Sequence, residues 1–171
     1  MRSAYRGTIV HCLADPGEQD AASTWECFED GLLVVERGKV VDVGPAEKLL
    51  PRVSGNAAVE DLSGKIIAPG FIDCHVHYPQ LNIIASYGEQ LLDWLNRYAY
   101  PEEQRFADPA YAREVADVFV TELLKNGTTT ALVFATVYPH SADAVFEAAA
   151  ARSMRLIAGK VLMDQHCPEP L

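Results

Sequence analysis

The sequence has little positive charge and no cluster of basic residues. Of its 171 residues, 24 are acidic and 14 are lysine or arginine, which gives a formal net charge of −10 at pH 7. Proteins that bind nucleic acids or anionic membranes normally carry a basic patch that neutralises phosphate groups. The composition therefore argues against nucleic-acid and membrane partners.

Long hydrophobic runs and paired cysteines are also missing. No stretch approaches the roughly 20 apolar residues of a membrane span, and residues 1–14 lack the uninterrupted apolar core of a secretory signal. The four cysteines, Cys12, Cys27, Cys74 and Cys167, form no C-x-x-C pair. We therefore expect reduced thiols and a cytoplasmic location.

The first third of the chain is rich in β-branched residues. Leu32–Glu36 and Lys39–Val43 flank a two-residue turn, which predicts a β-hairpin. A short helix is expected from Ala46 to Leu50, and Pro51 is expected to end it. The amino-acid composition changes near Ser63-Gly64, which is the best boundary between two domains.

Residues 65–171 alternate between predicted strands and helices. Strands are expected at residues 71–77, 128–135 and 156–163, and helices at 90–98, 109–125 and 142–152, the last capped by Ser141. This order implies right-handed βαβ units and a parallel sheet, so the fold class is α/β. In the first helix, Leu91 and Trp94 share one face. They can wall a pocket or belong to the core, and the core role is favoured at this spacing.

Two histidines lie at alternate positions of one apolar strand. His75 and His77 are expected to project from the same face, because alternate side chains of a strand point the same way. Two imidazoles so placed can bind one divalent ion such as zinc. Histidines at this spacing also occur by chance, so the pair alone leaves metal binding and an ordinary structural role both open.

Neighbouring polar residues have simpler interpretations. Asp73 can orient a ligand histidine or bond the backbone, and the structural role is favoured. Cys74 is expected to point away from the histidine face, which argues against catalysis by its thiol. We interpret His11, His140 and His166 as ordinary surface or loop histidines.

The strand and its continuation resemble a known family. Residues 68–77, Ala-Pro-Gly-Phe-Ile-Asp-Cys-His-Val-His, are similar to the first-strand signature of the amidohydrolase superfamily. Tyr78-Pro79-Gln80, residues 91–96 (LLDWLN) and residues 125–130 (KNGTTT) look like the guanine deaminase branch in particular. The resemblance covers about residues 60–167, and the residues before it match the family's small β-sandwich only in general character.

The resemblance implies a zinc-dependent hydrolysis of guanine to xanthine and ammonia, with one zinc ion per complete site. It makes His75 and His77 metal ligands and places His77 and Gln80 against the substrate. An amide such as Gln80 offers a donor and an acceptor together, as a purine edge does. The alternative for Gln80 is a loop residue that bonds the backbone.

The fold implied by the resemblance is incomplete in this chain. Residues 1–64 would belong to the β-sandwich, and residues 65–171 would form about the first three βα units of a (β/α)8 TIM-type barrel, which typically needs about 250 residues. No catalytic residue is placed here, since the acid/base carboxylate is expected beyond Leu171. We expect the 171 residues alone to bind zinc weakly and to turn over no guanine, and the full-length form to be a homodimer.

Two other interpretations remain open. The chain can belong to an amidohydrolase deaminase or chlorohydrolase that acts on a different heterocycle. It can also belong to a non-catalytic scaffold that keeps the fold without the metal, although the presence of both His75 and His77 counts against this.

Overall fold

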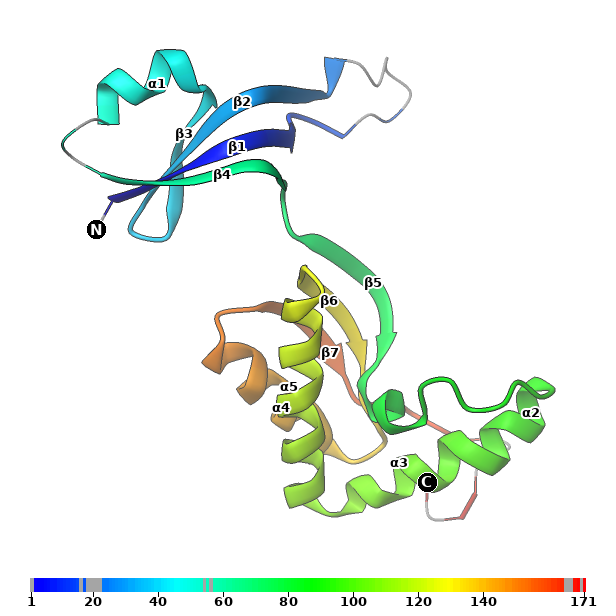
Figure 1. Ribbon diagram of the computed structural model, residues 1–171. Helices are drawn as coiled ribbons and strands as arrows, with labels where there is room; N and C mark the ends of the chain where they lie inside the picture. Colours follow the sequence, from blue (N-terminus) through cyan, green and yellow to red (C-terminus); the bar gives the residue numbers. More distant parts are fainter. Residues whose placement is uncertain are drawn as a thin grey trace. The chain divides into compact units, whose positions relative to one another are not determined.

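A computed structural model shows two compact units, residues 1–69 and residues 70–171 (Figure 1). It describes residues 2–15, 17, 23–53, 55, 57–164, 168–169 and 171. His166 and Cys167, which figured among the sequence expectations, lie outside the described residues. Within the described part of the chain, no helix combines the length and the apolar character needed to cross a membrane.

The first unit is one mixed four-stranded sheet with a short helix. Its elements are β1 (Arg2–Cys12), β2 (Trp25–Glu36), β3 (Lys39–Pro45), α1 (Ala46–Val53) and β4 (Ala58–Ile67). The strand order is β3-β2-β1-β4, and only the β1–β4 pair is parallel. The described residues of this unit form a single sheet and not two facing sheets, so the β-sandwich stays a prediction.

The predicted hairpin is confirmed as β2 and β3. Glu36 pairs with Lys39 across a two-residue turn. Arg37 and Gly38, the two turn residues, have φ angles of 52° and 75°. Positive φ at both central positions is the turn geometry that matches the right-handed twist of paired strands.

The expectation that Pro51 ends the first helix was wrong, because α1 continues through Pro51 to Val53. Proline removes one backbone hydrogen bond. Leu49 and Val53 are one helical turn apart, and both are buried in a cluster with Leu32 and Val34 of β2. Burial of these side chains offsets the lost hydrogen bond.

The boundary expected after Gly64 falls inside a strand. β4 continues to Ile67, which pairs with Ile9 of β1, so residues 65–67 hydrogen-bond within the first unit. The β1–β4 register slips between Arg6 and Thr8, opposite Gly64, whose φ is 82°. The Ser63-Gly64 signal therefore marks a bulge, a place where glycine readily supplies the left-handed backbone.

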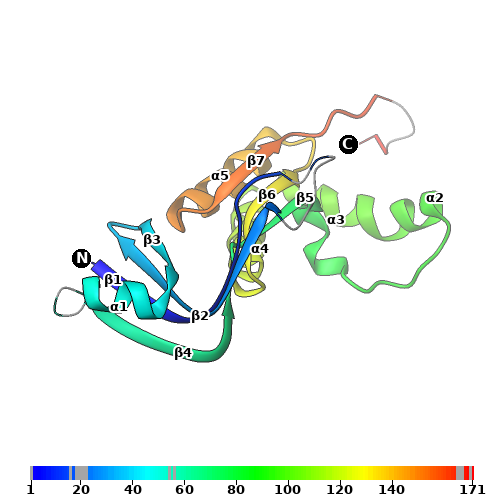
Figure 2. The same ribbon diagram turned by 90° about the horizontal axis from the view of Figure 1, so that it is seen from above.

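The second unit has a parallel sheet in the order β5-β6-β7, as the alternating pattern predicted. Its strands are β5 (Phe71–His77), β6 (Thr128–Phe134) and β7 (Arg155–Gly159), and its two long helices are α4 (Pro109–Lys125) and α5 (Pro139–Ala151). The two helices pack against each other and against one face of the sheet (Figures 1 and 2). The main core of the unit lies between these layers.

The ends of the two long helices test the capping predictions. Asp108 caps α4 by accepting a hydrogen bond from the Ala110 backbone N–H at 2.8 Å, and the helix ends at Asn126-Gly127 as expected. The cap predicted at Ser141 was wrong, because α5 begins earlier, at Pro139. Proline suits the first turn of a helix, where its missing N–H is not needed.

The helix expected over residues 90–98 is part of a longer helical run between β5 and α4. After β5 the chain forms η2 (Tyr78–Ile83), a 3-10 helix, and residues 84–90 are not helical. The run then consists of α2 (Leu91–Trp94), the π-helical turn η3 (Leu95–Ala99), α3 (Tyr100–Gln104) and the 3-10 turn η4 (Arg105–Ala107). Pro101 lies two residues after the last residue of the π-helical turn. A proline ring clashes with the carbonyl four residues earlier, and a widened turn before it relieves that clash.

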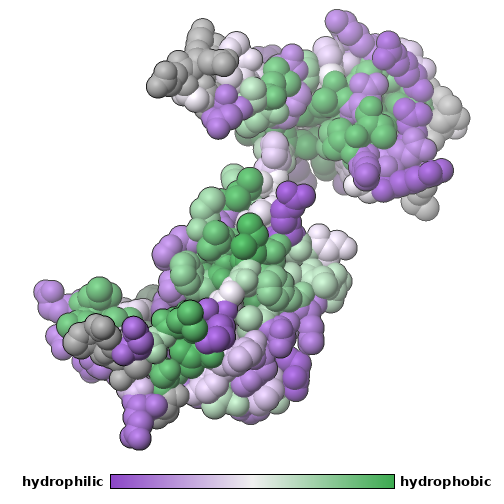
Figure 3. All heavy atoms as spheres, turned by 180° about the vertical axis from the view of Figure 1, so that it is seen from behind, coloured by the Kyte–Doolittle hydropathy of each residue, from purple (hydrophilic) through white to green (hydrophobic). Residues whose placement is uncertain are grey.

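The sheet face opposite α4 and α5 leaves apolar side chains exposed. Leu132 of β6 and Ile157 of β7 are register partners, and Ile157 is 61% exposed. Phe71 and Ile72 of β5 are each 68% exposed. Figure 3 shows hydrophobic side chains gathered on the second unit. Strands of a parallel sheet are normally covered on both faces, so this face has the character of an interior surface.

Gly70, the residue before β5, has no room for a side chain. A Cβ atom added there would overlap the Thr129 side chain and lie 2.7 Å from its Cβ. We expect Gly70→Ala to lower the free energy of unfolding by about 1–3 kcal/mol through this overpacking. Gly88→Ala is the matched control, because nothing lies within 4 Å of an added Cβ there. Urea denaturation of both variants measures the difference, and equal midpoints would contradict the crowding at Gly70.

Candidate metal and substrate site

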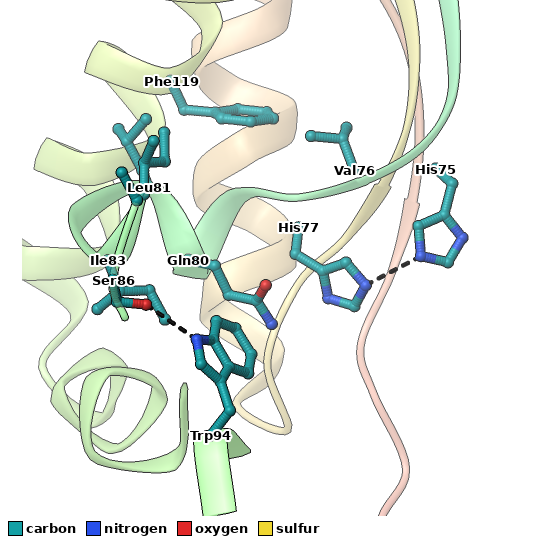
Figure 4. Close-up of a pocket in the computed structure, with 11 residues that line it drawn as sticks. His75, Val76, His77, Gln80, Leu81, Ile83, Ser86, Trp94 and Phe119 are labelled. Atoms are coloured by element: carbon teal, nitrogen blue, oxygen red, sulfur yellow. Dashed lines mark hydrogen bonds between the residues drawn. The ribbon is translucent and has the colours of Figure 1, made fainter. Parts of the chain in front are cut away.

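The two histidines of the strand motif lie on the same side of β5, as predicted. The Nε2 atoms of His75 and His77 are 3.2 Å apart (Figure 4). Two nitrogens bound to one tetrahedral zinc at about 2.0–2.1 Å are roughly 3.3 Å apart. The pair therefore already has nearly the spacing that one shared ion requires.

An aromatic side chain of the next strand supports both rings. Phe134 is the register partner of His77 on β6. Its ring centroid is 4.6 Å from that of His77, with the planes 11° apart, and 4.8 Å from that of His75. Such contacts restrict the rotation of the imidazoles. Sequence reasoning missed this role, because the pairing register of β5 and β6 is not visible in the sequence.

The electrostatics of the pair suit a metal ligand. Burial, and to a lesser extent the neighbouring His75, lowers the pKa of His77 below its ordinary value. A lowered pKa keeps the imidazole neutral near pH 7, and the neutral form is the one that binds metals. Among the described residues, no third histidine, cysteine or carboxylate completes a metal-binding group. The donor set fits a divalent ion but supplies only two of the three protein ligands usual in catalytic zinc sites.

Asp73 has the structural role that was favoured. Its Oδ1 accepts a hydrogen bond from the His75 backbone N–H at 3.0 Å. The register of β5 with β6 slips between Asp73 and Val76, which leaves backbone groups without their usual ladder partners. The aspartate therefore satisfies the backbone at the point where the strand presents His75.

The histidines open into a hollow of about 380 Å³, within the size range of small-molecule sites. It is lined by His75, Val76, His77, Gln80, Leu81, Ile83, Ile84, Ala85, Ser86, Trp94 and Phe119. In the close-up, the Gln80 amide lies between the His77 ring and the Trp94 indole (Figure 4). The structure thus brings together His75, His77 and Gln80, all three residues named from the sequence.

A buried tyrosine anchors the turn that carries Gln80. Tyr78 begins η2, is fully buried, and donates a hydrogen bond from its hydroxyl to the Ser141 carbonyl of α5 at 2.7 Å. Burial raises the pKa of this hydroxyl, more than the hydrogen bond lowers it. The phenol therefore stays neutral and can donate, which holds the start of η2 against the helix.

The core interpretation of Leu91 and Trp94 was wrong for Leu91, which is 69% exposed. Trp94 is half-buried and lines the hollow, and its indole Nε1 donates to Ser86 Oγ at 2.9 Å. The helical spacing alone did not show which neighbours the helix would contact. The π-helical turn that follows also changes the phase of the faces.

His11, His140 and Cys74 lie outside the hollow's lining. His11 pairs with Glu26 in the first unit at 3.1 Å. His140 is partly buried, and its Nε2 lies 2.6 Å from the Phe106 carbonyl oxygen. Neither belongs to a metal-binding group among the described residues. Cys12, Cys27 and Cys74 are exposed free thiols.

Two adjacent glutamates on α3 were not singled out from the sequence. Glu102 and Glu103 are both only 6% exposed. Glu102 is well paired, accepting hydrogen bonds from Asn82 at 3.1 Å, from Arg105 at 2.9 Å and from the Tyr111 hydroxyl. Glu103 contacts the side chain of Gln80. An acidic pair in a helix normally indicates a solvated face, so the sequence gave no reason to bury it.

The match to known proteins agrees with this geometry. The model of the amidohydrolase family matches residues 66–170, a range that includes the histidine pair, Gln80 and both glutamates. The chain belongs to the amidohydrolase family.

Within this family, the chain is similar to guanine deaminases. The guanine deaminase of Escherichia coli strain K12 is 50% identical over 169 residues, which are 98% of this chain and 38% of the relative. A probable guanine deaminase of Deinococcus radiodurans is 43% identical over 94% of this chain. The chain spans less than two fifths of the length of these amidohydrolases.

Solved structures give the same result. The E. coli guanine deaminase superposes with a TM-score of 0.89 at 47% identity, covering 99% of this chain and 39% of the other. The guanine deaminase of C. acetobutylicum, solved with bound guanine in its active site, gives a TM-score of 0.83 at 29% identity and covers 100% and 39%. The fold of these 171 residues is therefore that of part of an amidohydrolase.

The histidine pair predicts weak metal binding by the chain itself. We expect isothermal titration calorimetry to show one Zn²⁺ per chain, bound more weakly than at a three-ligand site. His75→Ala and His77→Ala should each abolish binding, since each removes half of the ligand set. His11→Ala is the control, because His11 pairs with Glu26 in the other unit. Unchanged affinity in His77→Ala would contradict the assignment.

Substitution of Glu102 and of Glu103 by glutamine should change the stability of the fold in opposite directions. Burial would raise the pKa of Glu102, but its three hydrogen-bond donors outweigh burial and hold the pKa below its ordinary value. Glu102→Gln should therefore cost about 1–3 kcal/mol at pH 7. Burial raises the pKa of Glu103, so this group destabilises the fold progressively as pH rises from its unfolded-state pKa through its higher folded-state pKa.

Glu103→Gln should accordingly raise Tm at pH 7, and the gain should vanish on acidification to pH about 4, where the wild-type carboxyl is protonated as well. Thermal unfolding at the two pH values tests both variants. Equal loss of stability in Glu102→Gln and Glu103→Gln would show that the two carboxyls are equally well satisfied.

Proposed function

We propose that this chain is the N-terminal part of a zinc-dependent guanine deaminase, which hydrolyses guanine to xanthine and ammonia. The observation that carries the proposal is the meeting of three side chains in one hollow. The Nε2 atoms of His75 and His77 lie 3.2 Å apart, and the Gln80 amide lines the same cavity. The similarity to guanine deaminases over nearly the whole chain supports it.

His75 and His77 would hold the divalent ion through their Nε2 atoms. Bound zinc supplies Lewis-acid chemistry and makes water nucleophilic at neutral pH. The residues of the chain fix where this chemistry takes place. Phe134 sets the orientation of both rings, and Asp73 holds the backbone of His75.

Gln80 would bind the polar edge of guanine. Its carboxamide offers one acceptor and two N–H donors. A buried amide that pairs with the correct base disfavours a base without the matching groups, since its own polar atoms would then stay unpaired. The Trp94 indole is fixed by Ser86 on the wall of the hollow and gives the flat base an apolar contact.

Three further parts of the proposal concern the complete protein. The parallel sheet would be the first three strands of a (β/α)8 barrel, whose remaining strands would cover the exposed face of Leu132 and Ile157. The four-stranded sheet of the first unit would form part of a β-sandwich. The missing metal ligands and the acid/base carboxylate would lie outside these residues, so the 171 residues alone would be inactive.

We further propose a cytoplasmic homodimer for the complete form. The exposed free thiols of the described cysteines suit a reducing compartment. The coding sequence after Leu171 offers a direct check of the fragment. A continuation with further histidines and a nearby glutamate is expected.

Related chemistry on another ring is the competing function. A 5-methylthioadenosine/S-adenosylhomocysteine deaminase of Thermodesulfovibrio yellowstonii is 30% identical over 81% of this chain. The guanine deaminases are more similar and match more of the chain. A non-catalytic scaffold would have no use for two imidazoles at metal-sharing distance.

Substitution of the base-reading amide separates these functions in the complete enzyme. Gln80→Ala should reduce kcat/KM for guanine by about 100-fold or more, because it removes paired buried hydrogen bonds. Gln90→Ala is the matched control, since Gln90 is exposed and does not line the hollow. Release of ammonia is the measurement. A zinc-loaded wild type that releases none from guanine but deaminates another heterocycle would overturn the guanine assignment.

A further inference from the structure

The two buried glutamates of α3 hold two residues of the same turn. Glu102 accepts a hydrogen bond from Asn82 Nδ2 at 3.1 Å, and Glu103 interacts with the side chain of Gln80 where η2 packs against α3. Asn82 and Gln80 both belong to η2, the turn that follows the histidine strand. Consecutive residues of one helix therefore determine the position of the turn and of its amide.

The two glutamates differ in how well they are satisfied. Glu102 has hydrogen bonds from Asn82, Tyr111 and Arg105, and the Arg105 guanidinium also stacks over Tyr111 at 4.0 Å. Glu103 has no cation beside it among the described residues, and its Oε2 has no hydrogen-bond partner there. A buried carboxyl with one unpaired oxygen destabilises a fold. The burial of Glu102 is thus explained by its contribution to stability, whereas the burial of Glu103 is not.

We propose that Glu103 is a positioning residue that fixes the orientation of the Gln80 amide toward the substrate. This inference rests on the proposed function of Gln80 and adds to it the group that sets its direction. Glu103 itself does not line the hollow and acts through Gln80.

The chemistry follows from the types of atom that meet. An ionised carboxylate only accepts hydrogen bonds, so it takes an N–H of the Gln80 amide and excludes the flipped arrangement in which Oε1 would face it. With the amide so held, Oε1 and the second N–H form one edge that is free to meet the base. A free glutamine amide can turn by 180° and exchange its acceptor and donor positions. Glu103 prevents this rotation, so the Gln80 amide can pair with only one pattern of donor and acceptor on the base.

A double-mutant cycle in the complete enzyme tests this coupling. Glu103→Gln keeps the shape of the side chain, but its amide can accept from the Gln80 N–H or donate to the Gln80 Oε1. We expect it to raise KM for guanine by about 3- to 10-fold with a smaller change in kcat, the size of one misdirected hydrogen bond. In the Gln80→Ala background the same substitution should have no further effect, because the amide that it directs is gone.

Glu102→Gln is the matched control, one residue away and equally buried. Its effect on kcat/KM, whatever its size, should multiply with that of Gln80→Ala, since Glu102 does not contact the amide. If Glu103→Gln behaves in the same multiplicative way, Glu103 has only a structural role and the proposal is wrong.

A crystal structure of the Glu103→Gln variant gives a second result that does not depend on activity. We expect the Gln80 side chain to occupy more than one orientation, or to leave the position between His77 and Trp94. A single unchanged Gln80 conformer would overturn the positioning role. If wild type does not act on guanine, the proposed function fails, and the crystal structure alone then decides whether Glu103 directs the amide.

Discussion

The shared position of two imidazoles at the end of one strand is the constraint on which the rest of the site depends. His75 and His77 reach an Nε2 separation of 3.2 Å because β5 is extended and is held in register beside β6. Phe134 of that neighbouring strand contacts both rings. Asp73 satisfies the backbone where the register slips. A shift of β5 by one residue would send these side chains to the other face and separate them from their support.

The turn after the strand completes the hollow beside this pair. Tyr78 fixes the start of η2 on α5, and Glu102 and Glu103 of α3 hold two of its later residues. Most of the polar contacts here strengthen the fold, as the well-paired Glu102 shows. Glu103 is different, because its burial weakens the fold while its one described side-chain partner is the amide that faces the hollow. Unsatisfied buried groups in a native protein are often found where function requires them.

The uncovered sheet face is the second consequence of the fold. Leu132 and Ile157 are register partners on the side away from α4 and α5, and exposed apolar residues of β5 add to them. Side chains at such positions fill the interior of a closed barrel. The same 171 residues match less than two fifths of the related guanine deaminases. The uncovered sheet face and the partial match are consistent with one another.

The sequence by itself determined the parallel βαβ order, the hairpin at Arg37-Gly38, the cap at Asp108 and the side of the strand that carries both histidines. These features depend on local periodicity and on residues whose backbone preference is strong. Family resemblance named Gln80 from its motif. Only the tertiary structure decided the continuation of α1 through Pro51, the bulge at Gly64, the exposure of Leu91 and the contacts of Phe134 and Glu103. Each of these depends on partners distant in the chain, and burial or strand register there outweighs local preference.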